Sequence, residues 1–173
     1  MDKRVLIAYG TKYGATAEIA EKIGAVLCQA GLRADVLPAD QVGDLNAYDA
    51  VVLGSAVYIG RWRKEAARFM EANEAALAQK PVWLFSSGPT GEGEPLELTE
   101  GWRLPGKLQP LADRIAPRDT ALFHGASDAN KLNFIERWML KNVKAPVGDF
   151  RDWQAITAWA RGIAEDLQRS VDA

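Results

Sequence analysis

Short apolar runs recur along the chain, and most of them are continuous rather than alternating with polar residues. They are Val5–Tyr9, Ala34–Leu37, Ala50–Leu53, Val82–Phe85 and Ala121–Phe123. Continuous runs of this length indicate strands that are buried on both faces. The pattern therefore predicts a sheet whose two faces are both covered.

Between these runs, apolar residues recur at helical spacing. The stretches with this spacing are residues 19–30, 69–77, 111–115 and 156–167. Gly31 follows the first stretch in the place of a helix C-cap, and Asp152 precedes the last in the place of an N-cap. We expect a helix over each stretch.

The alternation of strand and helix predicts an α/β fold. Repeated βα units form a doubly wound parallel sheet with helices on both faces, and we expect five strands in the order 2-1-3-4-5. In such a sheet the ligand crevice lies beyond the carboxyl ends of the strands. The length of 173 residues and the hydrophobic content of 48% predict one domain over residues 1–173.

Two segments interrupt the regular alternation. Residues 88–107, rich in Gly, Pro and Glu, predict a long loop after the fourth strand, and loops of that length are usually functional. Residues 131–144 predict an extra amphipathic helix after the fifth strand, because Leu132, Ile135 and Met139 fall at spacings of three and four. Three alternative roles follow for this helix: it covers an edge of the core, it makes a peripheral contact with a membrane, or it forms a homodimer interface.

Charge and cysteine content exclude several classes of protein. The 21 basic and 23 acidic side chains give a formal net charge of −2, which argues against nucleic-acid binding by bulk electrostatics. The single cysteine, Cys28, excludes an internal disulfide framework and a cysteine-based metal cluster, and we expect it to be buried on the first helix. The sequence contains neither a signal peptide nor an apolar run long enough to span a membrane, so we expect a cytoplasmic protein, with peripheral contact at the inner face of the membrane as the variant.

The segment Gly10–Thr16 joins the first strand to the first helix and has the composition of a phosphate-binding loop. It combines glycines with hydroxyl side chains at a helix N-terminus, where backbone N–H groups and the helix dipole attract anions. It lacks the Lys-Ser/Thr ending of a P-loop and the three-glycine spacing of a dinucleotide-binding turn. A phosphomonoester, such as that of FMN, is therefore the expected ligand.

Two further loops follow the third and fourth strands. Residues 54–62 predict a loop of small and aromatic residues that leads into a helix, and residues 86–91 predict a small, polar, turn-forming loop. The ends of the first, third and fourth strands are neighbours in the predicted sheet order. Together the three loops predict a phosphate site with two walls that hold a flat ring between them.

The first loop resembles the phosphate loop of the flavodoxins, and the resemblance covers the whole chain. Thr11-x-Tyr13-Gly14-x-Thr16 is similar to the Ser/Thr-x-Thr-Gly-x-Thr pattern of that family, with Tyr13 at a position where Thr is common. Within that superfamily the chain is similar in particular to the menaquinone-dependent protoporphyrinogen IX dehydrogenases. This closer likeness rests on residues 54–60, 134–141 and 152–153.

The resemblance implies a flavodoxin-like fold and FMN as the cofactor. It implies phosphate contacts from Thr11, Lys12, Tyr13, Gly14, Ala15 and Thr16. It implies isoalloxazine contacts from Ser55, Ala56, Val57, Tyr58, Ile59 and Gly60, and from Ser87, Gly88, Pro89, Thr90 and Gly91. Simple packing is the alternative to a flavin contact for Tyr58, and it is the favoured role for Trp62.

The resemblance favours an FMN-dependent oxidoreductase similar to the quinone-linked protoporphyrinogen dehydrogenases, in which the flavin carries the hydride or the electrons. A quinone or a redox protein would accept them. Two alternatives stay open: a flavodoxin-type electron-transfer protein without substrate chemistry of its own, and a flavin-free interaction domain. The sequence identifies no catalytic side chain and no metal site, and His124, its sole histidine, is interpreted as a structural residue at a strand end.

Overall fold

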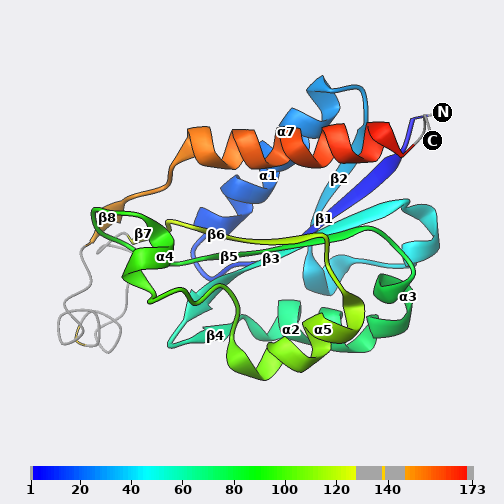
Figure 1. Ribbon diagram of the computed structural model, residues 1–173. Coiled ribbons are helices and arrows are strands. Elements are labelled where there is room, and N and C mark those ends of the chain that lie inside the picture. The colour runs from blue at the N-terminus through cyan, green and yellow to red at the C-terminus, as the bar shows by residue number, and fades with distance from the viewer. Residues whose placement is uncertain (1, 128–137, 139–146, 171–173) are drawn as a thin grey trace.

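A computed structural model describes residues 2–127, 138 and 147–170, and in it strands and helices alternate along the chain (Figure 1). Five parallel strands form the sheet in the order β2-β1-β3-β5-β6. They are β1 (Arg4–Gly10), β2 (Arg33–Pro38), β3 (Ala50–Tyr58), β5 (Val82–Ser87) and β6 (Asp119–Phe123). Because β4 is a short strand outside this path, the predicted order 2-1-3-4-5 of the long strands is confirmed.

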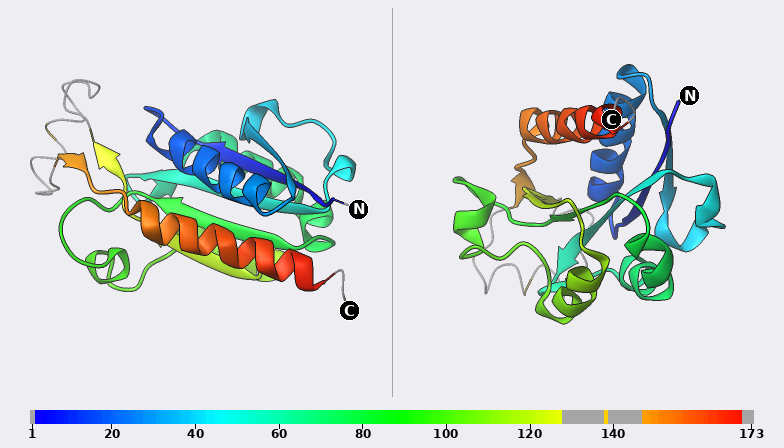
Figure 2. Two further views of the ribbon diagram at one scale, coloured as in Figure 1. Left: turned by 90° about the horizontal axis from the view of Figure 1, so that it is seen from above. Right: turned by 45° about the vertical axis from the view of Figure 1, so that its right-hand side comes forward.

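Helices cover both faces of the sheet. On one face α1 (Ala15–Gln29) and α7 (Trp153–Arg169) pack side by side, as Figure 2 shows from above. The opposite face carries α2 (Lys64–Ala72), α3 (Glu74–Ala78) and α5 (Gln109–Ile115) (Figure 1). The other elements are η1 (Ala39–Gln41), η2 (Leu45–Ala47), β4 (Arg61–Trp62), α4 (Pro95–Leu98), η3 (Gly106–Leu108), β7 (Ala126–Ser127) and β8 (Gly148–Asp149).

The core consists of two apolar clusters separated by the sheet. Side chains alternate along a strand, so β1 sends Leu6 into the cluster under α2, α3 and α5, and Ile7 into the cluster under α1 and α7. All six residues of β5 are buried, which confirms that this continuous apolar run is a strand covered on both faces. The run Ala34–Leu37 in the edge strand β2 is only half-buried, so the same prediction is wrong there. The helix stripes predicted from the sequence face these clusters, and Asp152 caps α7 by accepting hydrogen bonds from the N–H groups of Gln154 and Ala155, each at 3.0 Å.

The sequence analysis predicted a loop over residues 54–62, and this prediction is wrong. The strand continues to Tyr58, turns at Ile59–Gly60, and returns as β4, which pairs antiparallel with the end of β3. Gly54 keeps the strand regular because the ring of Phe85 occupies the space beside it: a Cβ atom added at Gly54 would lie 2.1 Å from that ring. Small residues here reflect close packing within the sheet rather than a loop.

Three other expectations need correction. The apolar stripe over residues 69–77 belongs to two helices, because Asn73 interrupts the helical backbone and its amide nitrogen donates to the carbonyl of Phe69 at 2.8 Å. The long segment 88–107 contains α4 and the start of η3. Cys28 is exposed, since it lies one residue, or about 100° of helix rotation, beyond the buried Leu27.

The predicted extra helix over residues 131–144 lies outside the described residues, apart from Trp138. The indole-bearing residue Trp138 is 62% exposed. The strands β7 and β8, which flank this segment in the sequence, pair with each other as a small antiparallel sheet beside the carboxyl ends of the main strands (Figure 1).

Candidate cofactor site

The strands that carry the three predicted ligand loops end side by side. Gly10 of β1 pairs in register with Ser55 of β3, and Ala56 pairs with Ser87 of β5. Ser87 in turn pairs with Phe123, the last residue of β6. The carboxyl ends of four neighbouring strands therefore form one platform, as the sequence analysis predicted for three of them.

The first loop, residues 11–14, leads from β1 into α1 by a left-handed turn. Gly14 has a φ angle of +95°, which L side chains rarely adopt, and its N–H group donates to the Thr11 hydroxyl oxygen at 3.0 Å. No side chain of the described residues caps α1, so the N–H groups of its first turn keep their capacity for an outside acceptor. A Cβ atom added at Gly14 would have no atom within 4 Å, and this open space lies at the positive end of the helix dipole.

The second loop region is the β3–β4 hairpin, and the first loop contacts it. The ammonium group of Lys12 lies 4.3 Å from the ring centroid of Tyr58 and 5.3 Å from that of Tyr13. This cation–π arrangement joins two predicted site residues from different loops. It also means that one face of Tyr58 is turned to Lys12.

The tip of the hairpin is strained and exposed. Ile59 has a φ angle of 51°, an uncommon conformation for a β-branched residue, and it is 68% exposed. Gly60 follows with a φ angle of 68°, so the turn has two residues in the left-handed region, as type I′ hairpin turns require. A strained and exposed apolar residue beside a candidate site is a functional indicator.

The third loop packs closely between the ends of β3 and β6. A Cβ atom added at Gly88 would lie 3.2 Å from Cβ of Val57, and one added at Gly125 would lie 3.0 Å from the backbone of Gly88. The N–H group of Gly88 donates to the Phe123 carbonyl at 3.2 Å, and that of Gly125 donates to the Pro89 carbonyl at 2.9 Å. Ser87–Gly91 is thus fixed by its backbone next to the hairpin.

Beneath the loops, buried hydroxyl groups bond to protein partners. The indole N–H group of Trp62 donates to the Ser86 hydroxyl oxygen at 2.8 Å, which agrees with the favoured packing role of Trp62. The Ser55 hydroxyl oxygen accepts from the Arg63 backbone N–H group at 2.9 Å and donates to the Ala56 carbonyl at 2.8 Å. These bonds fix the base of the site.

Arg63 is a site candidate that the sequence analysis missed. It is close to the first loop, since a Cβ atom added at Gly10 would lie 2.9 Å from Cβ of Arg63. Within the described part of the chain, its Nε atom is buried without a hydrogen-bond partner and lies 3.8 Å from a Glu65 carboxylate oxygen. A cation at this position suits an anionic ligand. Its place three residues after Gly60, the last predicted wall residue of that loop, was the only sequence signal.

Arg151 ties the first turn of α1 to the segment before α7. Its guanidinium group, with the side chain only 10% exposed, contacts the carboxylates of Asp149 at 2.8 Å and Glu18 at 2.6 Å. It also donates to the Ala15 carbonyl at 3.1 Å and lies 4.8 Å from the ring centroid of Trp153. The hydrogen bonds from Arg151 lower the pKa of Asp149, and those carboxylates raise the pKa of the guanidinium.

These observations suit an anionic ligand. The helix start with its left-handed glycine has the geometry that favours a phosphate group, and the hairpin and the third loop lie beside it. Among the described residues, no cluster of three or more His, Cys, Asp or Glu side chains is arranged for a metal ion. No helix in the same part of the chain has the length and apolar character needed to cross a membrane.

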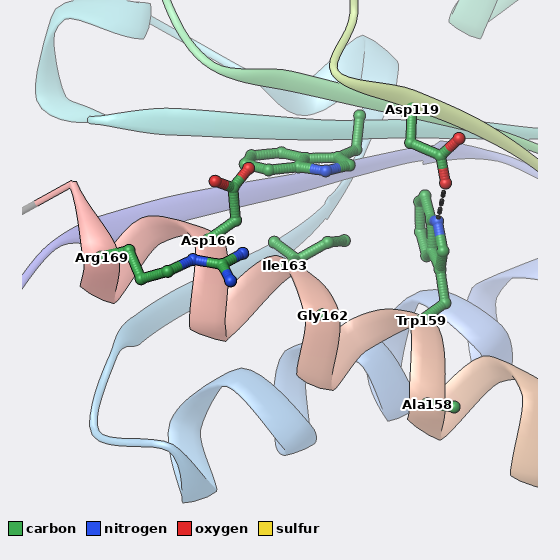
Figure 3. Close-up of a pocket in the computed structure, with 8 residues that line it drawn as sticks. Asp119, Ala158, Trp159, Gly162, Ile163, Asp166 and Arg169 are labelled. Atoms are coloured by element: carbon green, nitrogen blue, oxygen red, sulfur yellow. Dashed lines mark hydrogen bonds between the residues drawn. The ribbon is translucent and has the colours of Figure 1, made fainter.

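A groove of about 430 Å³ lies elsewhere, at the amino ends of β5 and β6 (Figure 3). It runs between these strands and α7, and its lining includes Trp83, Asp119, Trp159 and Asp166. The indole N–H group of Trp159 donates to Asp119 at 2.8 Å, and Asp166 pairs with Arg118 at 2.9 Å. Since these polar groups bond to each other and the three loops lie at the opposite end of the strands, we place the candidate cofactor site at the carboxyl ends.

The fold and the arrangement of the strand ends define a flavodoxin-like protein. The chain belongs to the flavodoxin domain family, whose profile matches residues 6–153. Solved structures agree with the fold. A flavodoxin from the domain Archaea superposes with a TM-score of 0.64 at 16% identity, covering 95% of this chain and 99% of its own. Oxidised flavodoxin 2 from Bacillus cereus gives 0.61 at 20% identity, covering 94% and 99%.

A dehydrogenase from Escherichia coli aligns with almost the whole length of this chain. Protoporphyrinogen IX dehydrogenase (quinone) of Escherichia coli strain K12 is 23% identical over an alignment 172 positions long, which covers 93% of this chain and 94% of the relative. Homologues of the same name from two other Escherichia coli strains align equally well. The likeness to this dehydrogenase therefore extends over most of the chain and beyond the phosphate loop.

Proposed function

We propose that this protein binds FMN at the carboxyl ends of β1, β3 and β5 and oxidises a protoporphyrinogen-type substrate with a quinone as the electron acceptor. The observation that carries the proposal is the end-to-end likeness to the Escherichia coli protoporphyrinogen IX dehydrogenase, at 23% identity over 93% of the chain. The three loops support it, because they provide a phosphate cradle and two walls within a single platform.

In this proposal, the loop Thr11–Thr16 holds the FMN phosphate through the N–H groups at the start of α1, and Arg63 adds a positive charge nearby. Ser55–Gly60 and Ser87–Gly91 hold the isoalloxazine ring between them. When bound, the flavin supplies the hydride and electron transfer itself. The chain's task is to bind and orient the ring and to leave one side open to reactants.

Exposed apolar side chains around the site suit a large apolar reactant. Ile59 at the hairpin tip is 68% exposed, Val147 before β8 is 51% exposed and Leu98 on α4 is 43% exposed. All three lie on segments that follow carboxyl ends of strands or border β8. Such side chains gain free energy by covering an apolar ligand, at about 25 cal/mol for each Å² removed from water.

Residues 131–144 supply the remaining part of the proposal. A basic amphipathic helix there would bring the protein to a membrane surface, where a lipid-soluble quinone is found. Trp138, which is 62% exposed, is the residue of this segment that the structure describes, and an indole suits the interface between lipid and water. Homodimerisation through the same segment is the alternative role.

A non-enzymatic electron carrier is the second candidate function. It is favoured by the solved structures of flavodoxins that cover nearly all of this chain, such as the archaeal one at 95%. The formal net charge of −2 argues for the enzyme, because a carrier that docks electrostatically benefits from a strongly charged face.

The test is a pair of anaerobic reactions with the FMN-reconstituted protein. The first measures how fast the reduced protein is reoxidised by a menaquinone analogue, and the second follows protoporphyrin fluorescence from protoporphyrinogen in the presence of that quinone. Gly14→Val, expected to lack the cofactor, is the control. Fast quinone turnover with porphyrin formation supports the enzyme. Slow reaction with quinone, together with fast electron transfer to a redox protein, overturns it in favour of the carrier.

A further inference from the structure

His124 lies directly after β6, and its ring is placed between two carbonyl groups of the third loop. Nδ1 lies 3.1 Å from the Pro89 oxygen, and Nε2 lies 2.7 Å from the Gly93 oxygen. The residue is only 8% exposed. Both ends of the segment Pro89–Gly93 are therefore held to one imidazole, and the predicted wall residues Thr90 and Gly91 lie between them.

The two partners of the ring have the same hydrogen-bonding character. A carbonyl oxygen accepts hydrogen bonds and cannot donate, whereas a neutral imidazole has a single N–H group. A neutral His124 can therefore satisfy one of its two contacts, and only the doubly protonated ring can donate to both. Gly91 and Gly93, with φ angles of 120° and 106°, allow the backbone to fold so that both oxygens face the ring.

We propose that His124 is a positioning residue whose protonated ring fixes the third loop against the flavin, so that FMN binding and protonation of His124 favour each other. This inference rests on the proposed FMN site. With the proton in place, Pro89 and Gly93 are both anchored and Thr90–Gly91 is held in the shape of the wall. Without this proton one of the two hydrogen bonds is lost, and the cost of ordering Thr90–Gly91 is then subtracted from the binding free energy of FMN.

Several charged residues belong to the elements that contact the ring. Glu92 and Glu94 flank Gly93, and a carboxylate oxygen of Glu97 on α4 lies 4.0 Å from the position of a Cβ atom added at Gly93. On the side of β8, the ring of Phe150 lies 6.5 Å from that of His124, and the neighbouring Asp149 is paired with Arg151.

The coupling is reciprocal, which makes it measurable from both sides. If protonation of His124 raises the affinity for FMN by a factor, FMN raises the affinity of His124 for its proton by the same factor. One charge-assisted hydrogen bond corresponds to about a tenfold change in affinity. His124 is the only histidine in the sequence, so the imidazole nitrogens of the untagged protein give one assignable set of NMR signals.

The first experiment measures FMN affinity by flavin fluorescence between about pH 5.5 and pH 8.5, where an imidazole exchanges its proton. His124→Gln keeps a donor but cannot become cationic. Because the FMN phosphate also changes charge in this range, the informative quantity is the ratio of wild-type to variant affinity. We expect that ratio to fall about tenfold as pH rises. Asp119→Asn, at the other end of β6, is the matched control and should keep the wild-type dependence.

The second experiment needs no variant and therefore does not depend on the variant's folding. ¹⁵N-imidazole NMR of the wild-type protein at about pH 7 should show a larger doubly protonated fraction of His124 with FMN than without it. An unchanged fraction, or an affinity ratio that is constant with pH, overturns the role of His124 while the FMN site stands. A wild-type protein that binds no FMN at any pH overturns the proposed function, and this inference with it.

Discussion

The two ends of the sheet are built from the same strands but use their polar groups differently. At the amino end, Arg4 pairs with Asp35 at 2.7 Å, and the Tyr48 hydroxyl donates to the same carboxylate oxygen at 2.8 Å. The ammonium group of Lys80 adds a hydrogen bond to the Tyr48 carbonyl at 2.8 Å. At the carboxyl end, α1 begins without a side-chain cap from the part of the chain that the structure describes, and the hairpin tip carries an exposed apolar residue in a strained conformation.

The difference indicates that polar groups at the amino end stabilise the fold, whereas those at the carboxyl end are available for binding. The amino-end groups bond to one another, so that end has little left to offer a ligand. The hydrogen bond from Tyr48 and the neighbouring Arg4 lower the pKa of Asp35, and burial together with this bond raises the pKa of Tyr48. The carboxyl-end loops keep donors and apolar surface that no other described element satisfies, and these are the properties of a binding site.

The largest effect is expected from variants that block the proposed phosphate site at the carboxyl end. In the double variant Gly14→Val/Thr16→Leu, the valine enters the open space at the start of α1, and the left-handed Gly14 conformation is strained for any other residue. The leucine removes the buried Thr16 hydroxyl. We expect FMN affinity to fall by a factor on the order of 100 or more. The measurement is the flavin content after purification and gel filtration. Gly43→Ala, at an open position without a positive φ angle, is the control, and full flavin content in the double variant would refute the loop assignment.

Removing one arginine from each end compares the two networks directly. Arg151→Gln leaves Glu18 and Asp149 without their shared partner and frees α1 from the segment before α7, so we expect a loss of about 2 kcal/mol in the free energy of unfolding. Arg4→Gln removes a more exposed pair and should cost about 0.5 kcal/mol. Urea unfolding of both variants and the wild type measures the difference. Equal losses in the free energy of unfolding would mean that Arg151 stabilises the fold no more than the exposed Arg4 does.

Relief of backbone strain separates stability from function. Ile59→Gly at φ 51° and Ala116→Gly at φ 55° remove the same kind of strain at opposite ends of the sheet, and each should add about 1 kcal/mol to the free energy of unfolding. Only Ile59→Gly should also slow the reaction with quinone, because it removes exposed apolar surface beside the site. Thermal unfolding and quinone kinetics on both variants test this. If Ile59→Gly gains stability at no kinetic cost, the hairpin tip has no role in binding.

The smallest expected effect is a pH dependence. Hydrogen bonds from Arg151 hold the pKa of Asp149 below its ordinary value of 3.8, so its contribution to stability is complete above that pH and is lost as the pH falls through the folded-state pKa. Asp149→Asn should therefore be less stable than the wild type at pH 7, with a difference that disappears in acid. Asp35→Asn should behave alike at the amino end. Urea titrations at several pH values below 5 give the result, and a difference that grows in acid would contradict the assignment.

Local patterns predicted the main elements of this fold because packing and sequence agree there. The stripe that includes Ile19, Ile23 and Leu27 faces the core as α1, and the uninterrupted apolar runs form the strands, which are covered on both faces at the centre of the sheet and half-buried at its β2 edge. The hairpin was missed because a glycine such as Gly54 is typical of loops. Here a glycine is required because the ring of Phe85, some thirty residues away in the sequence, occupies the space of a side chain. Asn73 ends a helix through its own side chain, which an apolar stripe cannot reveal.

The candidate site was predictable in its position but not in its internal contacts. Composition placed three loops at adjacent strand ends, and the register of Gly10, Ser55 and Ser87 agrees. The pairing of Lys12 with Tyr58 and the ring of His124 between two carbonyls depend on tertiary distances. No period or motif in the chain encodes them.

The bare start of α1 has a consequence for the life of the protein in the cell. A helix that lacks its own cap gains one when an anion binds, so the folded state is stabilised in proportion to how far the cofactor concentration exceeds its dissociation constant. At a hundredfold excess this amounts to about 2.7 kcal/mol. If FMN is the ligand, a shortage of riboflavin would shorten the protein's lifetime as well as silence it, and the abundance of the protein would report on vitamin supply.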